Sequence, residues 1–331
     1  MPTTTKRNGV TIVIAVAVVA ALGWLAWSRF GGSGDGFSTE TETAAAWIAR
    51  EFDQPTPDWE DFGPAVYADI AIGLTGAGVE EDTADAALAT LAVLSDQLLG
   101  TPGSAPAGAV GKVVLAIEAR GENPATYIPE RDVEAELRGM LGDDGRFADD
   151  VYNQSLAILG LAATDDGVPD GAGDWLASKQ CDTGDFTFAG DCPAEAGSED
   201  PDTTAVALQA LLATGETEAA VAATAWLLML QAEDGSISSF GTANANSTAA
   251  VAQALRAAGE ADAADRAAAF VATLQIDAPG EAEGGIRFSA ADSVPNGYAT
   301  IQGMLAFGAP AYDEIGAMGP PPRLAIAAAA R

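Results

Sequence analysis

Side chains that can bind cations or exchange protons are concentrated between Cys181 and Asp202. This stretch carries enough carboxylates to surround a hard cation such as Ca²⁺ with oxygen ligands. Their spacing does not follow the pattern of the common helix–loop–helix calcium site. We therefore predict a solvated acidic loop, with calcium binding as the alternative. The carboxylates are Asp182, Asp185, Asp191, Glu195, Glu199, Asp200 and Asp202.

Histidine is absent from the chain. Its absence excludes Ser-His-Asp and Cys-His catalysis, and any zinc site that uses an imidazole ligand. No imidazole of this chain can coordinate the metal of a cofactor either. We therefore predict no metal site.

Cys181 and Cys192 are the only cysteines. In an exported domain, two cysteines this close predict a disulfide, which stabilises the fold by about 2–3 kcal/mol. A redox-active pair is the alternative, but Lys179 is the only basic neighbour that would lower a thiol pKa.

An internal repeat indicates which elements position these residues. The segment 200–211 is echoed by the segment 244–255, and a helix with an apolar face and a terminal Gln precedes each copy. Repeats of this length are typical of stacked helix pairs. Leu-x-x-x-Gly endings at 74–78, 211–215 and 255–259 mark helices that stop in a left-handed cap.

Six helix pairs follow from these signals, and we predict an all-α (α/α)6 toroid over residues 38–310. An open solenoid is the alternative, but neither end shows a polar capping repeat. The first, outer members are expected at 38–50, 83–99, 131–141, 172–180, 216–231 and 261–275. The second, inner members are expected at 65–77, 107–120, 151–163, 202–214, 246–258 and 297–307. Residues 311–331 are predicted to be a flexible tail outside the ring.

A closed ring gathers the first turns of its inner helices around one mouth. Amide, hydroxyl and phenol groups there suit a small molecule with a polar edge. Serial capping of the helices by these residues is the alternative, and Ser247 is a further polar neighbour. The predicted ligand-binding residues are Tyr67, Asp69, Lys112, Tyr152, Asn153, Gln154, Asp202, Thr204, Asn246, Thr248, Asn296 and Tyr298.

Asp69 and Lys112 form a special case within this set. They stand at equivalent depth on the first two inner helices, and Lys112 lies in an otherwise apolar segment. Adjacent helices are about 8–10 Å apart, so the two charges can meet. We predict a structural ion pair, with Lys112 facing an anionic ligand group as the alternative.

The repeat as a whole resembles the prenyltransferase and squalene-oxidase repeat, with its Trp-Leu…Gln…Asp-Gly run followed by Asp/Asn-x-Asp/Asn-Thr/Ser-Thr-Ala. That family forms α/α toroids, among them terpene cyclases, protein prenyltransferase subunits and cobalamin carriers of the intrinsic-factor type. The segment 200–205 is similar to the class II cyclase motif Asp-x-Asp-Asp-Thr-Ala, in which the middle Asp protonates an alkene. The resemblance makes Asp202 that acid, assisted by Asp200, although Thr203 replaces the adjacent Asp. The competing interpretation is that Asp202 caps its helix, as Asn246 would one repeat later.

From this resemblance we expect a non-catalytic protein that binds a bulky, cobalamin-like small molecule. No cofactor is expected unless a corrinoid is the ligand. The first alternative is a terpene cyclase-like enzyme that uses Asp202. The second is a glycan-active (α/α)6 enzyme with paired carboxylates, for which few Trp residues fall on the inner helices.

The N-terminus and the charge predict location and partners. Basic residues within 1–9 precede the uncharged segment 10–28, which predicts a transmembrane anchor with a cytoplasmic N-terminus and an extracytoplasmic body; secretion after cleavage is the alternative. Residues 29–37 are a predicted linker. The formal charge of −33 disfavours nucleic-acid binding. Protein partners are not predicted.

Overall fold

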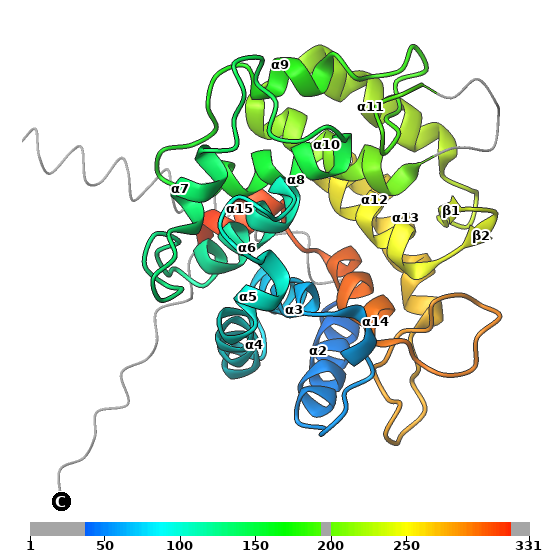
Figure 1. The fold of residues 1–331 in the computed structure, drawn as a ribbon. Helices are drawn as coiled ribbons and strands as arrows, with labels where there is room; N and C mark the ends of the chain where they lie inside the picture. The colour runs from blue at the N-terminus through cyan, green and yellow to red at the C-terminus, as the bar shows by residue number, and fades with distance from the viewer. Residues whose placement is uncertain (1–36, 193–199, 319–331) are drawn as a thin grey trace, which may run out of the picture. The chain divides into compact units, whose positions relative to one another are not determined.

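The computed structural model describes residues 37–192 and 200–318 (Figure 1). The predicted anchor at 10–28 lies outside these residues. Among the described residues, no helix has the length and apolar character needed to cross a membrane. From Thr39 onward, the described residues belong to one compact unit.

Six helices line the interior of this unit, and each contacts the next in sequence. They are rich in Ala, Val, Leu and Ile on all faces, as buried helices require. The last of them also contacts the first, so the row of helices is closed. These inner helices are α3 (Ala65–Ala77), α6 (Ala107–Ala119), α8 (Val151–Ala162), α10 (Pro201–Thr214), α12 (Ala245–Ala257) and α14 (Gly297–Gly303), which η2 (Met304–Phe307) continues.

An outer helix or helix pair precedes each inner helix, so the six predicted pairs match the helices of the structure within a few residues. The outer elements are α2 (Ser38–Phe52), α4 (Glu81–Val93) with α5 (Ser95–Leu99), α7 (Val133–Arg138), α9 (Ala172–Ala177), α11 (Thr217–Leu230) and α13 (Ala261–Leu274). The connections carry η1 (Glu60–Phe62) and a short hairpin of β1 (Ser238–Ser239) and β2 (Thr242–Ala243).

In the last three pairs, a glutamine that follows the outer helix forms a hydrogen bond to the next outer helix around the ring. Nε2 of Gln180 donates to the carbonyl oxygens of Gly184 and Ala219, both at 2.8 Å. Gln231 repeats this arrangement toward Ala263 on α13, at 2.9 Å. The bonds to Ala219 and Ala263 join a loop to the first turn of the following outer helix.

An equivalent glutamine hydrogen bond joins the last outer helix to the first and closes the ring. Nε2 of Gln275, which follows the last outer helix, donates to the carbonyl oxygen of Glu40 on the first, at 2.9 Å. Gly284 (φ +87°) lies directly against the carbonyl of Thr43, where a Cβ atom would overlap backbone atoms. The closure therefore rests on residues more than two hundred positions apart in the sequence, and it depends on a glycine.

The C-terminal boundary differs from the sequence-based prediction. Residues 312–318, assigned above to a flexible tail outside the ring, form α15 (Tyr312–Met318), which packs against α3, α6 and α8. Ile315 is fully buried beside Gly76, and the backbone N–H of Tyr312 donates to Oε1 of Gln209 at 3.0 Å. The apolar side chain of Ile315 gives this segment a face to bury, which the tail prediction overlooked.

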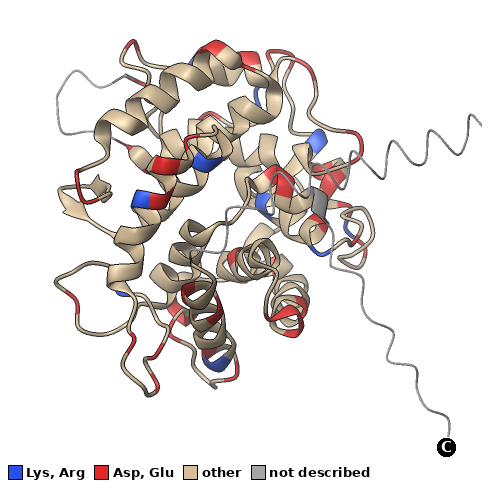
Figure 2. Ribbon diagram, turned by 180° about the vertical axis from the view of Figure 1, so that it is seen from behind, with Lys and Arg blue, Asp and Glu red and all other residues tan. Residues whose placement is uncertain are grey.

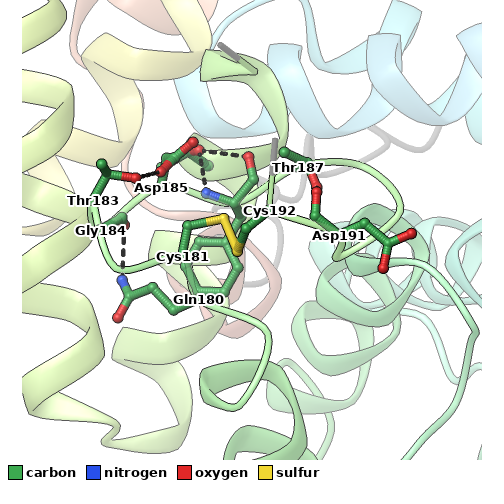
Figure 3. Close-up of a disulfide and its surroundings, with 10 residues drawn as sticks. Gln180, Cys181, Thr183, Gly184, Asp185, Thr187, Asp191 and Cys192 are labelled. Atoms are coloured by element: carbon green, nitrogen blue, oxygen red, sulfur yellow. Dashed lines mark hydrogen bonds between the residues drawn. A yellow bond between two sulfur atoms is a disulfide. The ribbon is translucent and has the colours of Figure 1, made fainter. Parts of the chain in front are cut away.

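The predicted disulfide between Cys181 and Cys192 is confirmed, with Cα atoms 5.4 Å apart (Figure 3). It closes the loop that follows α9. Within this loop the carboxylate of Asp185 accepts hydrogen bonds from the hydroxyl of Thr183, and its carbonyl accepts one from the N–H of Cys181 at 2.9 Å. The loop is thus fixed by its own contacts as far as residue 192.

Acidic residues lie mainly on the outer helices and loops (Figure 2). Three of the inner helices, α8, α12 and α14, contain none. Asp69 on α3 and Asp202 on α10 are carboxylates within these largely apolar inner helices, which makes them the first residues to examine for function.

Candidate functional site

The first turns of the inner helices are capped by residues other than those predicted. Oδ1 of Asp200 accepts the N–H of Thr203 at 2.9 Å, and Oδ1 of Asn244 accepts the N–H of Ser247 at 2.9 Å. The predicted caps Asp202 and Asn246 are therefore wrong, because each true cap lies two residues earlier in the chain. Asp150 and Asn296 cap α8 and α14 in the same way.

Because Asp200 caps α10, the side chain of Asp202 can make other contacts. Its Oδ2 accepts a hydrogen bond from the hydroxyl of Ser247, on the next inner helix, at 3.0 Å. The Nδ2 group of Asn244 in turn donates to that hydroxyl at 3.2 Å. The carboxyl group is therefore oriented by the neighbouring repeat, through a residue that also belongs to the cap of α12.

The surroundings of Asp202 favour its protonated form. Burial raises the pKa of its carboxyl, and the negative charge of Asp200 raises it further. The hydrogen bond from Ser247 lowers the pKa but does not cancel the effect of burial. The net result is a carboxyl that holds its proton to higher pH than an ordinary aspartate, as a general acid requires.

Several predicted ligand-binding residues have structural roles instead. The hydroxyls of Thr204 and Thr248 are fully buried, and each accepts a backbone N–H of the loop that precedes its helix, from Phe186 and Ile237 respectively, at 3.0 Å. Gln154 is also fully buried, and its Oε1 accepts the N–H of Phe147 at 2.7 Å. These three side chains fix the loops that precede α8, α10 and α12, which we call the mouth loops.

Asn153 and Asn296 also have roles in the helix starts. Nδ2 of Asn153 donates to the carboxylate of the α8 cap, Asp150, at 2.9 Å, and its backbone lies against Gly108. Asn296 is the cap of α14. For these two residues, the capping alternative describes the structure better than ligand binding.

The predicted ion pair between Asp69 and Lys112 is confirmed. Nζ of Lys112 lies 2.9 Å from Oδ1 and 3.2 Å from Oδ2 of Asp69. The two side chains retain 15% and 11% exposure, so the pair is not sealed. Burial lowers the pKa of the lysine, but the charge of Asp69 and the nearby phenols of Tyr152 and Tyr298 outweigh it, so the pKa is raised and the ammonium stays charged.

Three tyrosines interact electrostatically with this pair. Tyr152 comes from the start of α8, Tyr298 from the start of α14 and Tyr312 from α15. Each interacts electrostatically with both Asp69 and Lys112. Burial, together with the charge of Asp69, raises the pKa of all three phenols, which therefore remain protonated hydrogen-bond donors at neutral pH.

Two phenylalanine rings stack on two of these tyrosines and lie closer to the surface. Phe62 stacks on Tyr298, with ring centroids 5.0 Å apart, and Phe188 stacks on Tyr152 at 6.3 Å. Both phenylalanines are about half exposed. The rim of the mouth is therefore aromatic, whereas its interior carries carboxylate, ammonium and phenol groups.

The remaining predicted residues lie beside this centre. Asn246 donates through Nδ2 to Oε1 of Gln302 at 2.7 Å, and its own Oδ1 is buried with no hydrogen-bond partner among the described residues. Tyr67 packs edge-on against Phe52, with centroids 6.1 Å apart. A cavity of about 150 Å³ reaches Lys112 from between α3, α6 and α8.

Sequence reasoning missed two residues of this centre. Tyr312 was missed because the domain was ended at residue 310, although Ile315 three residues later signals a buried turn of helix. Gln302 was missed because the repeat offers no equivalent amide in the other inner helices. In the described part of the acidic loop and elsewhere in residues 37–192 and 200–318, no group of three or more ligand-type side chains is arranged to hold a metal ion.

The geometry therefore offers a partly buried acid, an aromatic rim and a charged pair with an unshared N–H donor, all at one mouth. Such a site can bind an amphipathic molecule and can deliver a proton to it. Histidine-dependent chemistry is not open to it, because the chain has no histidine.

Comparison with known proteins identifies the fold. The structure of the type II terpene cyclase MstE from Scytonema aligns with a TM-score of 0.56 and 15% identity, over 82% of this chain and 97% of that one. An Asp-to-Asn variant of MstE, in complex with its substrate geranylgeranyl dihydroxybenzoate, aligns with a TM-score of 0.55 and 13% identity, over 84% and 97%. No family model matches the sequence, and no curated protein is significantly similar to it. The chain thus has a terpene cyclase-like helical toroid fold; identity this low establishes the fold alone.

Proposed function

We propose that this chain is a type II terpene cyclase-like enzyme, in which Asp202 protonates an alkene of an isoprenoid substrate. The observation that carries the proposal is the state of Asp202: partly buried, raised in pKa, and oriented by Ser247 rather than used as a helix cap. The similarity to MstE supports the fold that such a reaction uses.

The proposed step transfers one proton. The O–H bond of the Asp202 carboxyl breaks, a C–H bond forms at one alkene carbon, and the other carbon becomes a carbocation that the next double bond attacks. Loss of a proton from the final cation ends the reaction, and solvent returns a proton to Asp202. The substrate is isomerised, so no oxidant or cofactor is consumed.

The surrounding residues suit a cationic intermediate. Tyr152 and Tyr298 both interact electrostatically with Asp202, and they bring two aromatic rings to the same region as the acid. Aromatic faces stabilise a nearby cation by about 0.5–2 kcal/mol each. Ser247 orients the carboxyl of Asp202 through its hydrogen bond, and Thr203 stands where the motif has its second aspartate.

Incubation with geranylgeranyl dihydroxybenzoate, the substrate in the MstE complex, tests this proposal. The expected result is a product of unchanged mass and shorter retention on a reversed-phase column. Asp202→Asn should abolish it. Asp132→Asn is the matched control, because Asp132 is an exposed cap of the outer helix α7 and asparagine caps equally well. Equal product from both variants would refute the role of Asp202.

Non-catalytic binding of a bulky small molecule is the second candidate. It is favoured by the amide pair of Asn246 and Gln302, whose buried Oδ1 has no described partner and suits a polar ligand. A protein that retains the test compound without converting it would support this candidate. A cobalamin-like ligand remains a prediction from the sequence resemblance.

A further inference from the structure

The Cys181–Cys192 disulfide lies in the mouth loop that precedes α10, and the proton transfer proposed above does not use it (Figure 3). The two halves of this loop differ in exposure. Cys181 and Phe186 are buried, whereas Phe188 and Cys192 are exposed. The disulfide therefore ties the exposed half of the loop to the buried half, and a reagent in solution can approach the bond from the side of Cys192.

Both halves of the loop contact the start of α10, the helix that carries Asp202. The N–H of Phe188 donates a hydrogen bond to Oδ2 of Asp200, the cap of α10, at 3.1 Å. In the buried half, the hydroxyl of Thr204 accepts the N–H of Phe186 at 3.0 Å. The contact through Phe188 is the exposed one of the two, so it is the one that a change in the loop reaches first.

Phe188 also contacts the start of α8. Its carbonyl oxygen accepts the N–H of Val151, the first residue of α8, at 2.8 Å. Its ring stacks on Tyr152, with centroids 6.3 Å apart. One exposed residue of the disulfide loop therefore joins the first turns of two neighbouring inner helices, and its release would loosen both.

The loop before α14 makes equivalent contacts without a disulfide. The hydroxyl of Thr300 accepts the N–H of Ile286 at 2.8 Å. The carbonyl oxygen of Phe288 accepts the N–H of Ala245, the first residue of α12, at 2.8 Å. Contacts of this kind therefore form without a cross-link, so opening of the disulfide should loosen its own loop and leave the ring folded.

We propose that the Cys181–Cys192 disulfide is a redox control site of the mouth, which a dithiol reductant opens. A thiolate of the reductant attacks Sγ of the exposed Cys192, the S–S bond breaks and Cys181 leaves as a thiolate. The second thiol of the reductant then displaces Cys192, so the reductant becomes a disulfide and the protein gains two electrons and two protons. Because the attacking thiolate belongs to the reductant, the chain needs no activated thiol of its own.

Reduction frees the exposed half of the loop from Cys181. Phe188 then leaves its position between α8 and α10, and the N–H of Val151 and the carboxylate of Asp200 each lose a partner. Exposed disulfides are more readily reduced than buried ones, which favours control at this bond. The inference goes beyond the proposed function, because it concerns the order of a mouth that an enzyme and a binding protein would share.

Hydrogen exchange on the full chain tests the inference, followed by residue-resolved mass spectrometry before and after reduction with dithiothreitol. Labelling with iodoacetamide shows that the bond has opened. The amide of Val151, which is bonded to Phe188 in the oxidised protein, should exchange about ten- to hundredfold faster after reduction. The amide of Ala245 is the matched internal control, because it makes the same bond to Phe288, and its exchange should not change.

A variant without the cross-link completes the design. Cys181→Ser combined with Cys192→Ser should exchange at Val151 as fast as the reduced protein, with and without dithiothreitol. Thermal melting shows whether this variant folds, and reduction of the unmodified chain decides the matter if it does not.

Three results would overturn the inference. The disulfide could stay closed in an excess of dithiothreitol, or Val151 could exchange equally fast in the oxidised and reduced protein. Equal acceleration at Val151 and Ala245 would show that the bond supports the whole ring and not the mouth loop. None of these results depends on turnover, so a failure of the cyclase proposal remains distinguishable from a failure of this one.

Discussion

The starts of α10 and α12 are capped in the same way, each by a side chain that accepts the N–H three residues later, but their chemistry differs. Asp202 and Asn246 each follow their helix cap by two residues. Each side chain forms a hydrogen bond to a residue of the next inner helix, Asp202 to Ser247 on α12 and Asn246 to Gln302 on α14. One side chain is a partly buried acid that accepts a hydrogen bond from Ser247, and the other is an amide that donates a hydrogen bond to Gln302. The repeat therefore determines where a side chain is placed, and the identity of the residue determines what it can do there.

The largest expected effect is a loss of turnover when Asp202 is replaced by the asparagine found at the equivalent position of α12. Asp202→Asn should lower turnover about 10²- to 10⁴-fold, since general acid catalysis contributes that much. The double swap Asp202→Asn with Asn246→Asp should remain inactive, because an acid at 246 faces Gln302 and not the Ser247 hydroxyl. Product formation measured by mass spectrometry checks both; activity in the double swap would show that either position serves.

The next comparison concerns two glycines of the ring. Gly284→Ala should lower the free energy of unfolding by about 3–5 kcal/mol, because it combines left-handed strain with a clash against the carbonyl of Thr43. Gly259→Ala has a similar φ of +85° but no atom within 4 Å of the new Cβ, so it should cost only about 1–2 kcal/mol. Urea denaturation of the two variants measures the difference, and equal losses would argue against closure through Gly284.

Ser247→Ala separates the positioning of the acid from its presence. Because the hydrogen bond from Ser247 lowers the pKa of Asp202, its removal should raise that pKa further. The protonated, active form then persists to higher pH, so the descending limb of the pH–rate profile should move upward while the maximal rate falls about tenfold. An unchanged profile would mean that Ser247 does not act on the acid.

The smallest effect is expected at the loop contacts of the repeat. Thr248→Val removes the acceptor for the N–H of Ile237 and should cost about 1–3 kcal/mol of stability. Thr204→Val removes the equivalent contact with Phe186 and should cost a similar amount. Thermal melting of both variants checks this; a loss of activity without a loss of stability would return these threonines to the ligand site.

The helix pairs could be predicted because their signals are local. Apolar periodicity, Gly stops and the echo of 200–211 in 244–255 are all visible in the sequence. The ion pair of Asp69 and Lys112 was also predictable, since equal depth on adjacent helices is a matter of counting. The pairing of Ser247 with Asp202 was not, because a contact between consecutive repeats depends on the rotation that Gln180, Gln231 and Gln275 impose on the ring.

The helix caps show a second reason why sequence alone does not assign the site residues. Asp200 and Asp202 have the same chemistry and are separated by one residue, so composition does not distinguish the cap from the acid. The position of Pro201 does, since proline favours the first helical turn and places the cap just before it. The function assigned to Asp202 changes with that single choice.

The central claim is that Asp202 delivers a proton to carbon, and isotope transfer tests it most directly. Turnover in D₂O, where the carboxyl proton has exchanged, should place one deuterium at a single former alkene carbon of the product, as nuclear magnetic resonance and mass spectrometry would show. The same experiment with Asp202→Asn should give no labelled product. A cyclised product without deuterium, or labelled product from Asp202→Asn, would contradict the claim.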